Sequence, residues 1–169
     1  MKSRQDKPAL YETSGQELGL SGTALLEIMQ AVLAKEAQFR FRATGWSMSP
    51  FIKNGDVITI APLKDIKPAI GQVVAFIRRE CDRLAVHRVI GRQGVQYLIQ
   101  GDNIAAQADG WFHPQDILGR VICIERDGKR VWLGMGPERY LIVIFSRIGL
   151  LIPLLKRIRL FKGMLMRCL

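Results

Sequence analysis

The sequence predicts a mainly β protein: an antiparallel, partly closed, barrel-like sheet with an N-terminal helix and a C-terminal helical tail. From residue 39 onward, short runs rich in Val and Ile recur, with turn residues between them and no helical pattern separating one run from the next. Strands spaced in this way pair as antiparallel neighbours, because parallel strands need long crossover connections. The 16 glycines and seven prolines supply the many turns that such a sheet requires.

The elements before the sheet are a lead-in and one helix. Residues 1–20 are polar, contain acids and have no apolar stretch like that of a cleavable signal peptide, so we expect a flexible lead-in. Ser21 is a candidate N-cap for an amphipathic helix within 21–38, covering about residues 23–37. Three apolar residues fall on one face of it: Leu25, Met29 and Val32. A single helix is too little for a DNA-binding helix-turn-helix domain.

The β domain is predicted to span residues 39–138. Its strands are expected at six runs with alternating or Val/Ile-rich patterns: 39–44, 56–63, 72–78, 84–91, 95–100 and 117–126. Asp127-Gly128 is a strong two-residue hairpin signal and leads into a further apolar run, KRVWL.

Residues 139–169 form a basic and apolar C-terminal segment. They contain seven basic and no acidic residues, whereas the first 138 residues carry 18 basic and 15 acidic ones. The apolar run 140–155 contains Arg147 and Pro153 and is shorter than the roughly 20 residues that span a bilayer. It is typical of a segment that contacts acyl chains and anionic headgroups at a membrane surface. The alternative is a helical hairpin packed on the domain or on a second subunit.

The confinement of the basic excess to the tail bears on the partners. A nucleic-acid-binding domain spreads its basic residues over a folded face, so no specific nucleic acid is expected. Three cysteines without a CxxC pair, together with only two histidines, give no disulfide framework and no metal cage. We expect no cofactor and no metal.

The stretch GWSMSP, residues 45–50, holds the candidate nucleophile, Ser47. A serine hydroxyl is a weak nucleophile unless a base removes its proton and donors stabilise the oxyanion that follows. Gly45 permits close backbone approach, and Pro50 turns the chain. Taken alone, the pattern also fits an ordinary turn serine, and Ser49 is a second hydroxyl close by.

The base and its orienting acid must come from elsewhere in the chain. His87 lies in the predicted strand AVHRVIG, while His113 precedes a proline in a loop and is the weaker candidate. An ordinary imidazole is mainly neutral at pH 7 and can accept a proton. Asp102 in GDN and Asp109 in ADG are both candidates to orient it, although each also fits a turn. The residues alone leave this choice open.

Five stretches in order resemble the type I signal peptidase clan, which also includes the self-cleaving SOS repressors. They are GWSMSPFIKNGDVITI, IKPAIGQVVAFI, LAVHRVIG, YLIQGDN and ILGRVICI, and they cover about residues 39–126. Bacterial-type signal peptidases and the repressors place Lys at the base position, whereas the archaeal and endoplasmic-reticulum-type branch places His followed by Arg-Val. AVHRVIG resembles the second branch.

The resemblance implies a role for each candidate. Ser47 would be the nucleophile and His87 the general base, so that activity falls as the imidazole is protonated below about pH 6–7. The orienting acid would lie in or just after GDN, where Asp109 fits best and Asp102 is the alternative. The backbone N–H of Ser47, helped by Thr44, would form the oxyanion hole. Family members often carry a hydroxyl residue where this chain has Gly45.

These observations lead to a functional hypothesis. We expect a membrane-associated serine endopeptidase of the signal peptidase type that cleaves a preprotein-like polypeptide at the cytoplasmic membrane. The sequence does not indicate on which face of the membrane cleavage occurs. Residues 139–169 would contact the lipids in place of the N-terminal anchor of typical signal peptidases. The alternatives are a self-cleaving, repressor-like regulator on the same fold, and a non-catalytic membrane-bound peptide-binding module.

Overall fold

The computed structural model describes residues 22–63, 67–78, 83–103 and 108–157. The predicted lead-in (1–20) and the tail beyond residue 157 lie outside the described residues. The division into 21–38, 39–138 and 139–169 stays a prediction.

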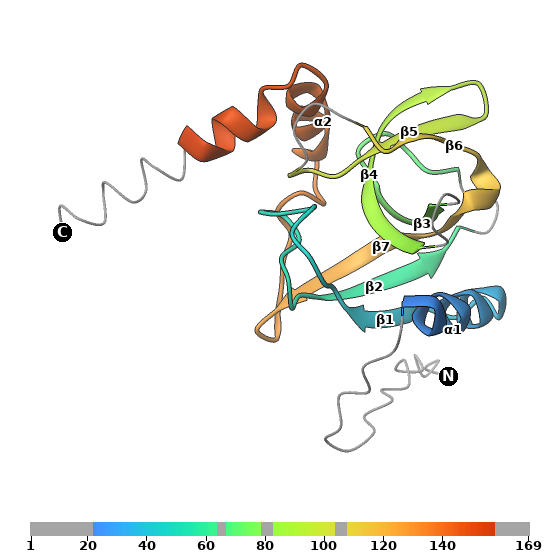
Figure 1. Ribbon diagram of the computed structural model, residues 1–169. Coiled ribbons are helices and arrows are strands. Elements are labelled where there is room, and N and C mark those ends of the chain that lie inside the picture. Colours follow the sequence, from blue (N-terminus) through green and yellow to red (C-terminus); the bar gives the residue numbers. More distant parts are fainter. Residues whose placement is uncertain (1–21, 64–66, 79–82, 104–107, 158–169) are drawn as a thin grey trace, which may run out of the picture.

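An antiparallel sheet of eight strands curls into a half-barrel, with one helix before it and short helices after it (Figure 1). The strand order is β1-β2-β7-β3-β4-β5-β6, with β8 paired to β7. The predicted fold class is therefore confirmed. Because β7 pairs with both β2 and β3, the last strand of this order in the sequence joins the pair β1-β2 to the series β3-β4-β5-β6.

Each of the six predicted runs contains a strand. They are β1 (Phe39–Arg42), β2 (Val57–Pro62), β3 (Val73–Arg78), β4 (Arg83–Gln93), β5 (Gln96–Gln100) and β7 (Ile117–Arg126). The short strand β6 (Gly110–Phe112) and the 3-10 turn η1 (Pro114–Asp116) were not predicted. The run KRVWL forms only the two-residue strand β8 (Lys129–Arg130).

The turn between β7 and β8 has the predicted hairpin form. Asp127 and Gly128 both have positive φ angles, 51° and 73°, and Arg126 pairs with Lys129 across them. Two consecutive left-handed residues match the twist of the flanking strands, and Asp-Gly adopts this conformation at low steric cost.

Helix α1 (Gly22–Ala34) packs against the sheet with a different face from the one predicted. Its buried residues are Leu26, Met29 and Leu33. The prediction was wrong for Leu25 and Val32, which flank this stripe and are only half-buried. Both stripes have helical spacing, and contact with the sheet selects the one that reaches its interior. The helix also ends earlier than predicted, because Glu36 adopts a left-handed conformation with φ 58°.

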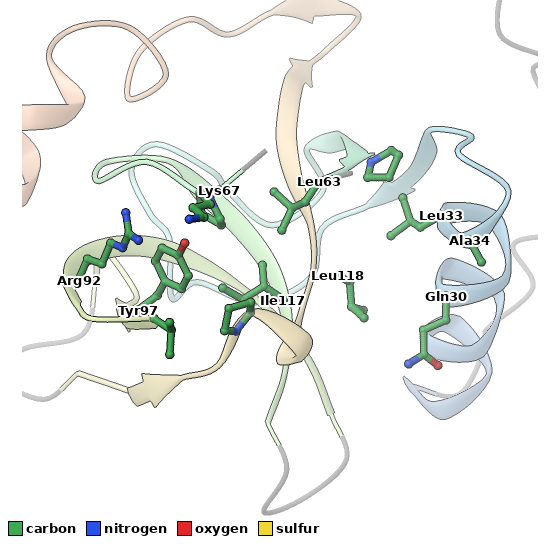
Figure 2. A pocket seen from close by; sticks show the side chains of 13 residues that line it. Gln30, Leu33, Ala34, Leu63, Lys67, Arg92, Tyr97, Ile117 and Leu118 are labelled. Atoms are coloured by element: carbon green, nitrogen blue, oxygen red, sulfur yellow. The ribbon is translucent and has the colours of Figure 1, made fainter. Parts of the chain in front are cut away.

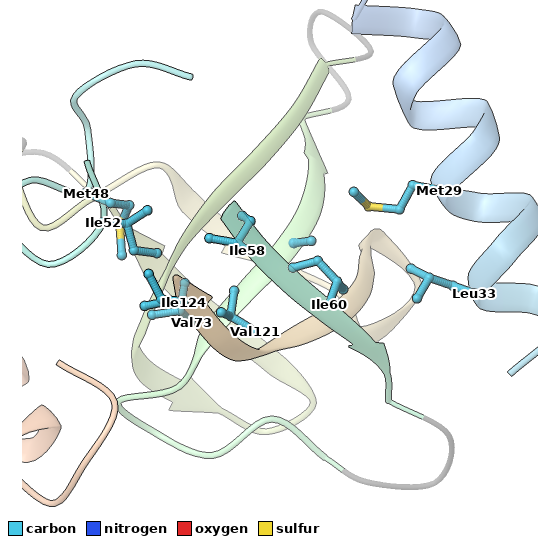
Figure 3. Packing of buried hydrophobic residues seen from close by; sticks show 10 residues of the cluster. Met29, Leu33, Met48, Ile52, Ile58, Ile60, Val73, Val121 and Ile124 are labelled. Carbon is cyan, nitrogen blue, oxygen red and sulfur yellow. The ribbon is translucent and has the colours of Figure 1, made fainter. Parts of the chain in front are cut away.

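The main hydrophobic core joins α1 to the sheet and to the loop that carries Ser47 (Figure 3). Met29 from the helix and Ile58 from β2 are fully buried. Met48 and Ile52, from the loop after Ser47, belong to the same cluster. Burial of each such side chain contributes about 1.5–3 kcal/mol, so this loop is anchored to the core directly after Ser47.

Beyond β8, the chain forms helix α2 (Arg139–Arg147) and is helical again over residues 151–157. Ile142 and Leu151 are buried and form a small cluster with Phe51, which lies in the Ser47 loop region. On the opposite side, Leu141 and Ile144 of α2 and Ile148, the residue just after it, are apolar and exposed. Within the described parts of the chain, none of the helices has the length and apolar character needed to cross a membrane.

Candidate active site

Ser47 lies in a bend between β1 and β2. Gly45 has a φ angle of 92°, which an L side chain rarely adopts, and its N–H donates to Asn54 Oδ1 at 3.0 Å. Trp46 is 63% exposed and Met48 only 4% exposed, so the bend directs its side chains alternately to solvent and to the core. Ser47 lies between them and is half-buried.

The Ser47 bend is held by the residue that follows the GD pair. The backbone N–H of Asn103 donates to the Ser47 carbonyl at 2.7 Å, and Asn103 Nδ2 donates to the Trp46 carbonyl at 3.1 Å. These hydrogen bonds fix the two peptide units on either side of the Ser47 Cα atom. The N–H of Ser47 itself has no hydrogen-bond acceptor among the residues that the structure describes.

The fold brings His87 from β4 to the hydroxyl of Ser47. His87 Nε2 lies 2.8 Å from Ser47 Oγ, and His87 Nδ1 lies 2.5 Å from Asp109 Oδ2. An ionised carboxylate only accepts hydrogen bonds, so Nδ1 carries the proton and Nε2 accepts from the serine hydroxyl. The imidazole side chain is 4% exposed and the Asp109 carboxylate 7%. The serine, histidine and aspartate are thus connected in the order that a general base requires.

The other oxygen of Asp109 is also engaged. Arg78, the last residue of β3, donates from Nη2 to Asp109 Oδ1. The Asp109 N–H donates to the Ile99 carbonyl at 2.8 Å, which ties this residue to β5. The carboxylate is therefore oriented by its own backbone and by a guanidinium. Sequence reasoning missed Arg78, because a strand-end arginine gives no signal that distinguishes it from a solvated one.

Asp102, the other carboxyl left open by the sequence, does not contact His87. It receives two hydrogen bonds from Arg88, from Nε to Oδ1 at 2.8 Å and from Nη2 to Oδ2 at 2.7 Å. Both side chains are 1% exposed. Arg88 also donates to the carbonyls of Gly71 and Gly134, each at 2.8 Å. This buried pair joins β4, which carries His87, to the turn whose Asn103 holds the Ser47 bend.

A second ion pair supports the chain after the Ser47 bend. Arg126 from β7 donates from Nε and Nη2 to the two oxygens of Asp56, at 2.8 and 2.7 Å, and Nη2 also donates to the Phe51 carbonyl at 3.2 Å. Burial raises the pKa of Asp56, but the hydrogen bonds from Arg126 and from the Lys53 N–H outweigh it. The net result is a pKa below the ordinary value of 3.8.

The remaining sequence candidates lie apart from these three side chains. His113 Nε2 contacts the Gln96 side chain at 2.9 Å on an exposed surface. Ser49 donates its backbone N–H to the Trp46 carbonyl, and no side-chain hydrogen bond joins it to His87. Thr44 is exposed, three residues before Ser47. Its hydroxyl has no hydrogen bond within the described residues.

Comparison with known proteins identifies a broad family. The family model described as Peptidase S24-like matches residues 13–122, which is most of the chain. The chain belongs to the Peptidase S24-like family. The curated proteins contain no match to it. Its fold is therefore that of a serine peptidase or of a self-cleaving, repressor-type protein, and Ser47, His87 and Asp109 all lie within the matched residues.

In this S24-like chain, the three side chains form an arrangement that can activate a hydroxyl. His87 is placed to take the Ser47 proton, Asp109 to stabilise the imidazolium, and the unpaired Ser47 N–H to donate to an oxyanion. No group of three potential metal-ligating side chains comes together in the described residues.

A separate cavity lies between α1 and the first residues of β5 and β7 (Figure 2). It has a volume of about 580 Å³, and its lining includes Leu33, Leu63 and Tyr97 but none of the three side chains of the candidate site.

Proposed function

We propose that the protein is a membrane-associated serine endopeptidase of the signal peptidase type, from the branch with a Ser-His pair. The observation that carries the proposal is the hydrogen-bonded series of Ser47 Oγ, His87 Nε2, His87 Nδ1 and Asp109 Oδ2. Membership of the Peptidase S24-like family supports the serine peptidase chemistry. The imidazole at the base position, followed by Arg88 and Val89, favours the Ser-His branch over relatives with a lysine base.

The proposed reaction follows from the protonation of the site, in which Ser47 Oγ and His87 Nδ1 carry protons and His87 Nε2 is free to accept one. Ser47 Oγ attacks the carbonyl carbon of a peptide bond while its proton passes to His87 Nε2, and Asp109 stabilises the imidazolium that forms. The carbonyl oxygen becomes an oxyanion that accepts from the Ser47 N–H. When the C–N bond breaks, His87 returns the proton to the leaving amine, which leaves an acyl ester on Ser47. Water, deprotonated by His87, then hydrolyses the ester and restores the hydroxyl.

The membrane part of the proposal rests on the exposed apolar face of the C-terminal helices. Leu141, Ile144 and Ile148 are 57%, 53% and 57% exposed on or just after α2, while its other side packs on the domain. Exposed basic residues accompany them at Arg147, Lys156 and Arg157. Apolar contact combined with basic residues is typical of segments that lie in the interface of an anionic membrane. We propose the cytoplasmic membrane as the location and a preprotein-like polypeptide as the substrate.

The test of the chemistry is cleavage of a diverse peptide library by the purified full chain, with mass spectrometry of the products. We expect cleavage at defined bonds by the parent protein, none by Ser47→Ala, and parental activity in Ser49→Ala, which removes the neighbouring hydroxyl. Small residues just before the cut would support the signal peptidase type. A parent protein that cleaves nothing would refute the proposal in favour of a peptide-binding module, and a Ser47→Ala variant that still cleaves would refute Ser47 as the nucleophile.

A self-cleaving regulator is the second candidate, because the clan that the sequence resembles includes self-cleaving repressors and the family match begins upstream of the sheet, at residue 13. Such a protein would cut its own chain upstream of the β domain. Incubation of the purified protein distinguishes the two. Two fragments that appear at a rate independent of protein concentration, and that are absent in Ser47→Ala, would favour self-cleavage over cleavage of a separate substrate.

A further inference from the structure

Three arginines from different elements line one small cavity on the side of the sheet next to α2. They are Arg120 in β7, Arg130 in β8 and Arg139, the first residue of α2. The cavity has a volume of about 290 Å³, and none of its lining residues is an aspartate or a glutamate. Gly71 lies in its wall because the aliphatic part of Arg139 packs directly over it. None of the lining residues belongs to the Ser47, His87 and Asp109 series.

The positive charges of this cavity have no carboxylate partner in the described part of the chain. The Nε atoms of Arg120 and Arg139 are buried and make no hydrogen bond there. Arg139 donates from Nη2 only to the neighbouring Tyr140 hydroxyl, at 3.1 Å. Arg130 stacks on Trp132, with its guanidinium carbon 4.2 Å from the ring centroid. A buried donor without an acceptor destabilises the fold, and a guanidinium cannot lose its charge to avoid this penalty.

Two carboxylates near this cavity in the sequence are already engaged. Glu138 precedes Arg139, but its Oε1 accepts the N–H groups of Gly134 and Gly136 at 2.7 and 3.0 Å. Burial raises the pKa of Glu138, but these backbone hydrogen bonds hold it below the ordinary value of 4.5. Glu125 pairs instead with Arg40, at 2.5 Å. The fold therefore uses these acids for other contacts and leaves the three arginines to a group from outside.

We propose that the cavity formed by Arg120, Arg130 and Arg139 binds a phosphate group, either free phosphate or the phosphate of a phospholipid headgroup. Guanidinium groups present paired N–H donors that match phosphate oxygens, and three of them suit a group with several charged oxygens. The lining includes Trp132, which is 63% exposed, and the next residue in the chain, Leu133, is 59% exposed. An exposed Trp beside basic residues is suited to the polar boundary of a membrane, so a lipid source has a place for its glycerol and upper acyl carbons.

The first arm of the test measures phosphate itself. Thermal unfolding of the full chain is followed while inorganic phosphate is titrated at constant ionic strength, with sodium chloride as the balancing salt. We expect a saturating rise in the midpoint for the parent protein. In Arg120→Gln/Arg139→Gln, the loss of charge-assisted hydrogen bonds should weaken binding by about tenfold or more. The control is Arg92→Gln, because Arg92 is exposed and lies outside this cavity.

The second arm identifies the source of the phosphate. Sedimentation with phosphatidylcholine vesicles is compared with vesicles that also contain phosphatidylglycerol. Binding to the anionic vesicles that is lost in the double variant and retained in Arg92→Gln would identify a lipid headgroup. A phosphate response without any such loss would identify free phosphate. Two results would overturn the proposal. One is an equal loss of vesicle binding in the double variant and in Arg92→Gln. The other is the absence of any phosphate response in the parent protein, together with equal vesicle binding by the parent and the double variant.

A chemical measurement covers the case in which the double variant does not fold. Phenylglyoxal modification of the parent protein, mapped by mass spectrometry, should slow at Arg120 and Arg139 when phosphate is added and stay unchanged at Arg92. Equal protection at all three positions, or none, would contradict a specific site. The outcome is independent of whether Ser47 acts as a nucleophile, so it separates this proposal from that of the peptidase.

Discussion

Replacement of Asp102 or of Asp109 by asparagine should produce two different phenotypes. Asp102 accepts two hydrogen bonds from Arg88 in a pair whose side chains are both 1% exposed. Asp102→Asn leaves the charge of Arg88 buried without its counter-ion. Breaking such a pair costs about 3–5 kcal/mol, a large part of the 5–15 kcal/mol that stabilises a typical domain. For a chain of this size, the unfolding midpoint should fall by roughly 6–20 °C.

Asp109→Asn should instead act on reactivity. Asn offers one acceptor and one donor group in place of two acceptors, so the imidazole loses its preference for the tautomer with the proton on Nδ1. In serine peptidases with the same arrangement, this change lowers the rate by about 10⁴-fold, which corresponds to roughly 5.5 kcal/mol of transition-state stabilisation. The fold should persist, because Arg78 can still donate to the amide oxygen.

Thermal unfolding gives the first phenotype, and the rate at which a fluorophosphonate reagent labels Ser47 gives the second. We expect Asp102→Asn to lose stability and to label normally below its unfolding midpoint, and Asp109→Asn to be near parental in stability but slow to label. If Asp102→Asn is as stable as the parent while Asp109→Asn labels at the parental rate, the assignment of the two acids is wrong.

Three further outcomes follow from contacts around the site. Arg78→Met should slow labelling of Ser47 by about tenfold or more, because a charge-assisted hydrogen bond to Asp109 is lost. Arg78→Lys should restore part of the rate. Equal rates in the parent and both variants would exclude a role of Arg78 in positioning Asp109. Asp56→Asn should destabilise the fold by about 1–3 kcal/mol above pH 5. Since the folded pKa of Asp56 lies below 3.8, urea unfolding at a series of pH values should show that difference shrinking as the pH falls through the folded pKa; a constant difference would contradict it. Ile144→Glu/Ile148→Glu should reduce sedimentation with anionic vesicles, whereas Ile28→Glu, at a 41% exposed position on α1, should not; equal losses would contradict docking through α2.

The predictable part of the fold is the part encoded by local patterns. Val- and Ile-rich runs between turn residues located six strands, and Asp127-Gly128 located a hairpin, because these signals depend on neighbouring residues alone. The three-residue strand β6 was missed since it is too short to show alternation and exists only through pairing with β5. The buried face of α1 was assigned one residue out of register, because two apolar stripes have helical spacing and only the position of the sheet selects one.

The candidate site divides in a similar way. The resemblance of five stretches to the signal peptidase clan pointed to Ser47 and His87 and favoured Asp109. The residues alone left the choice between Asp102 and Asp109 open, since both lie beside turn residues. The geometry separates them: one accepts from Arg88 in the interior and the other from His87. No sequence signal pointed to Arg78 or to the three arginines of the proposed phosphate site. Their roles depend on contacts between elements that come together only after folding. The lead-in and the end of the tail remain predictions.

Mapping the covalent adduct of a fluorophosphonate on the full chain by mass spectrometry tests the central claim most directly. The claim is that His87 activates the hydroxyl of Ser47. We expect one adduct, on Ser47, in the parent protein, and its loss in His87→Gln, which keeps a polar side chain of similar reach. An adduct on Ser49, equal labelling in the His87→Gln variant, or no adduct under conditions that label a control serine peptidase would contradict the claim.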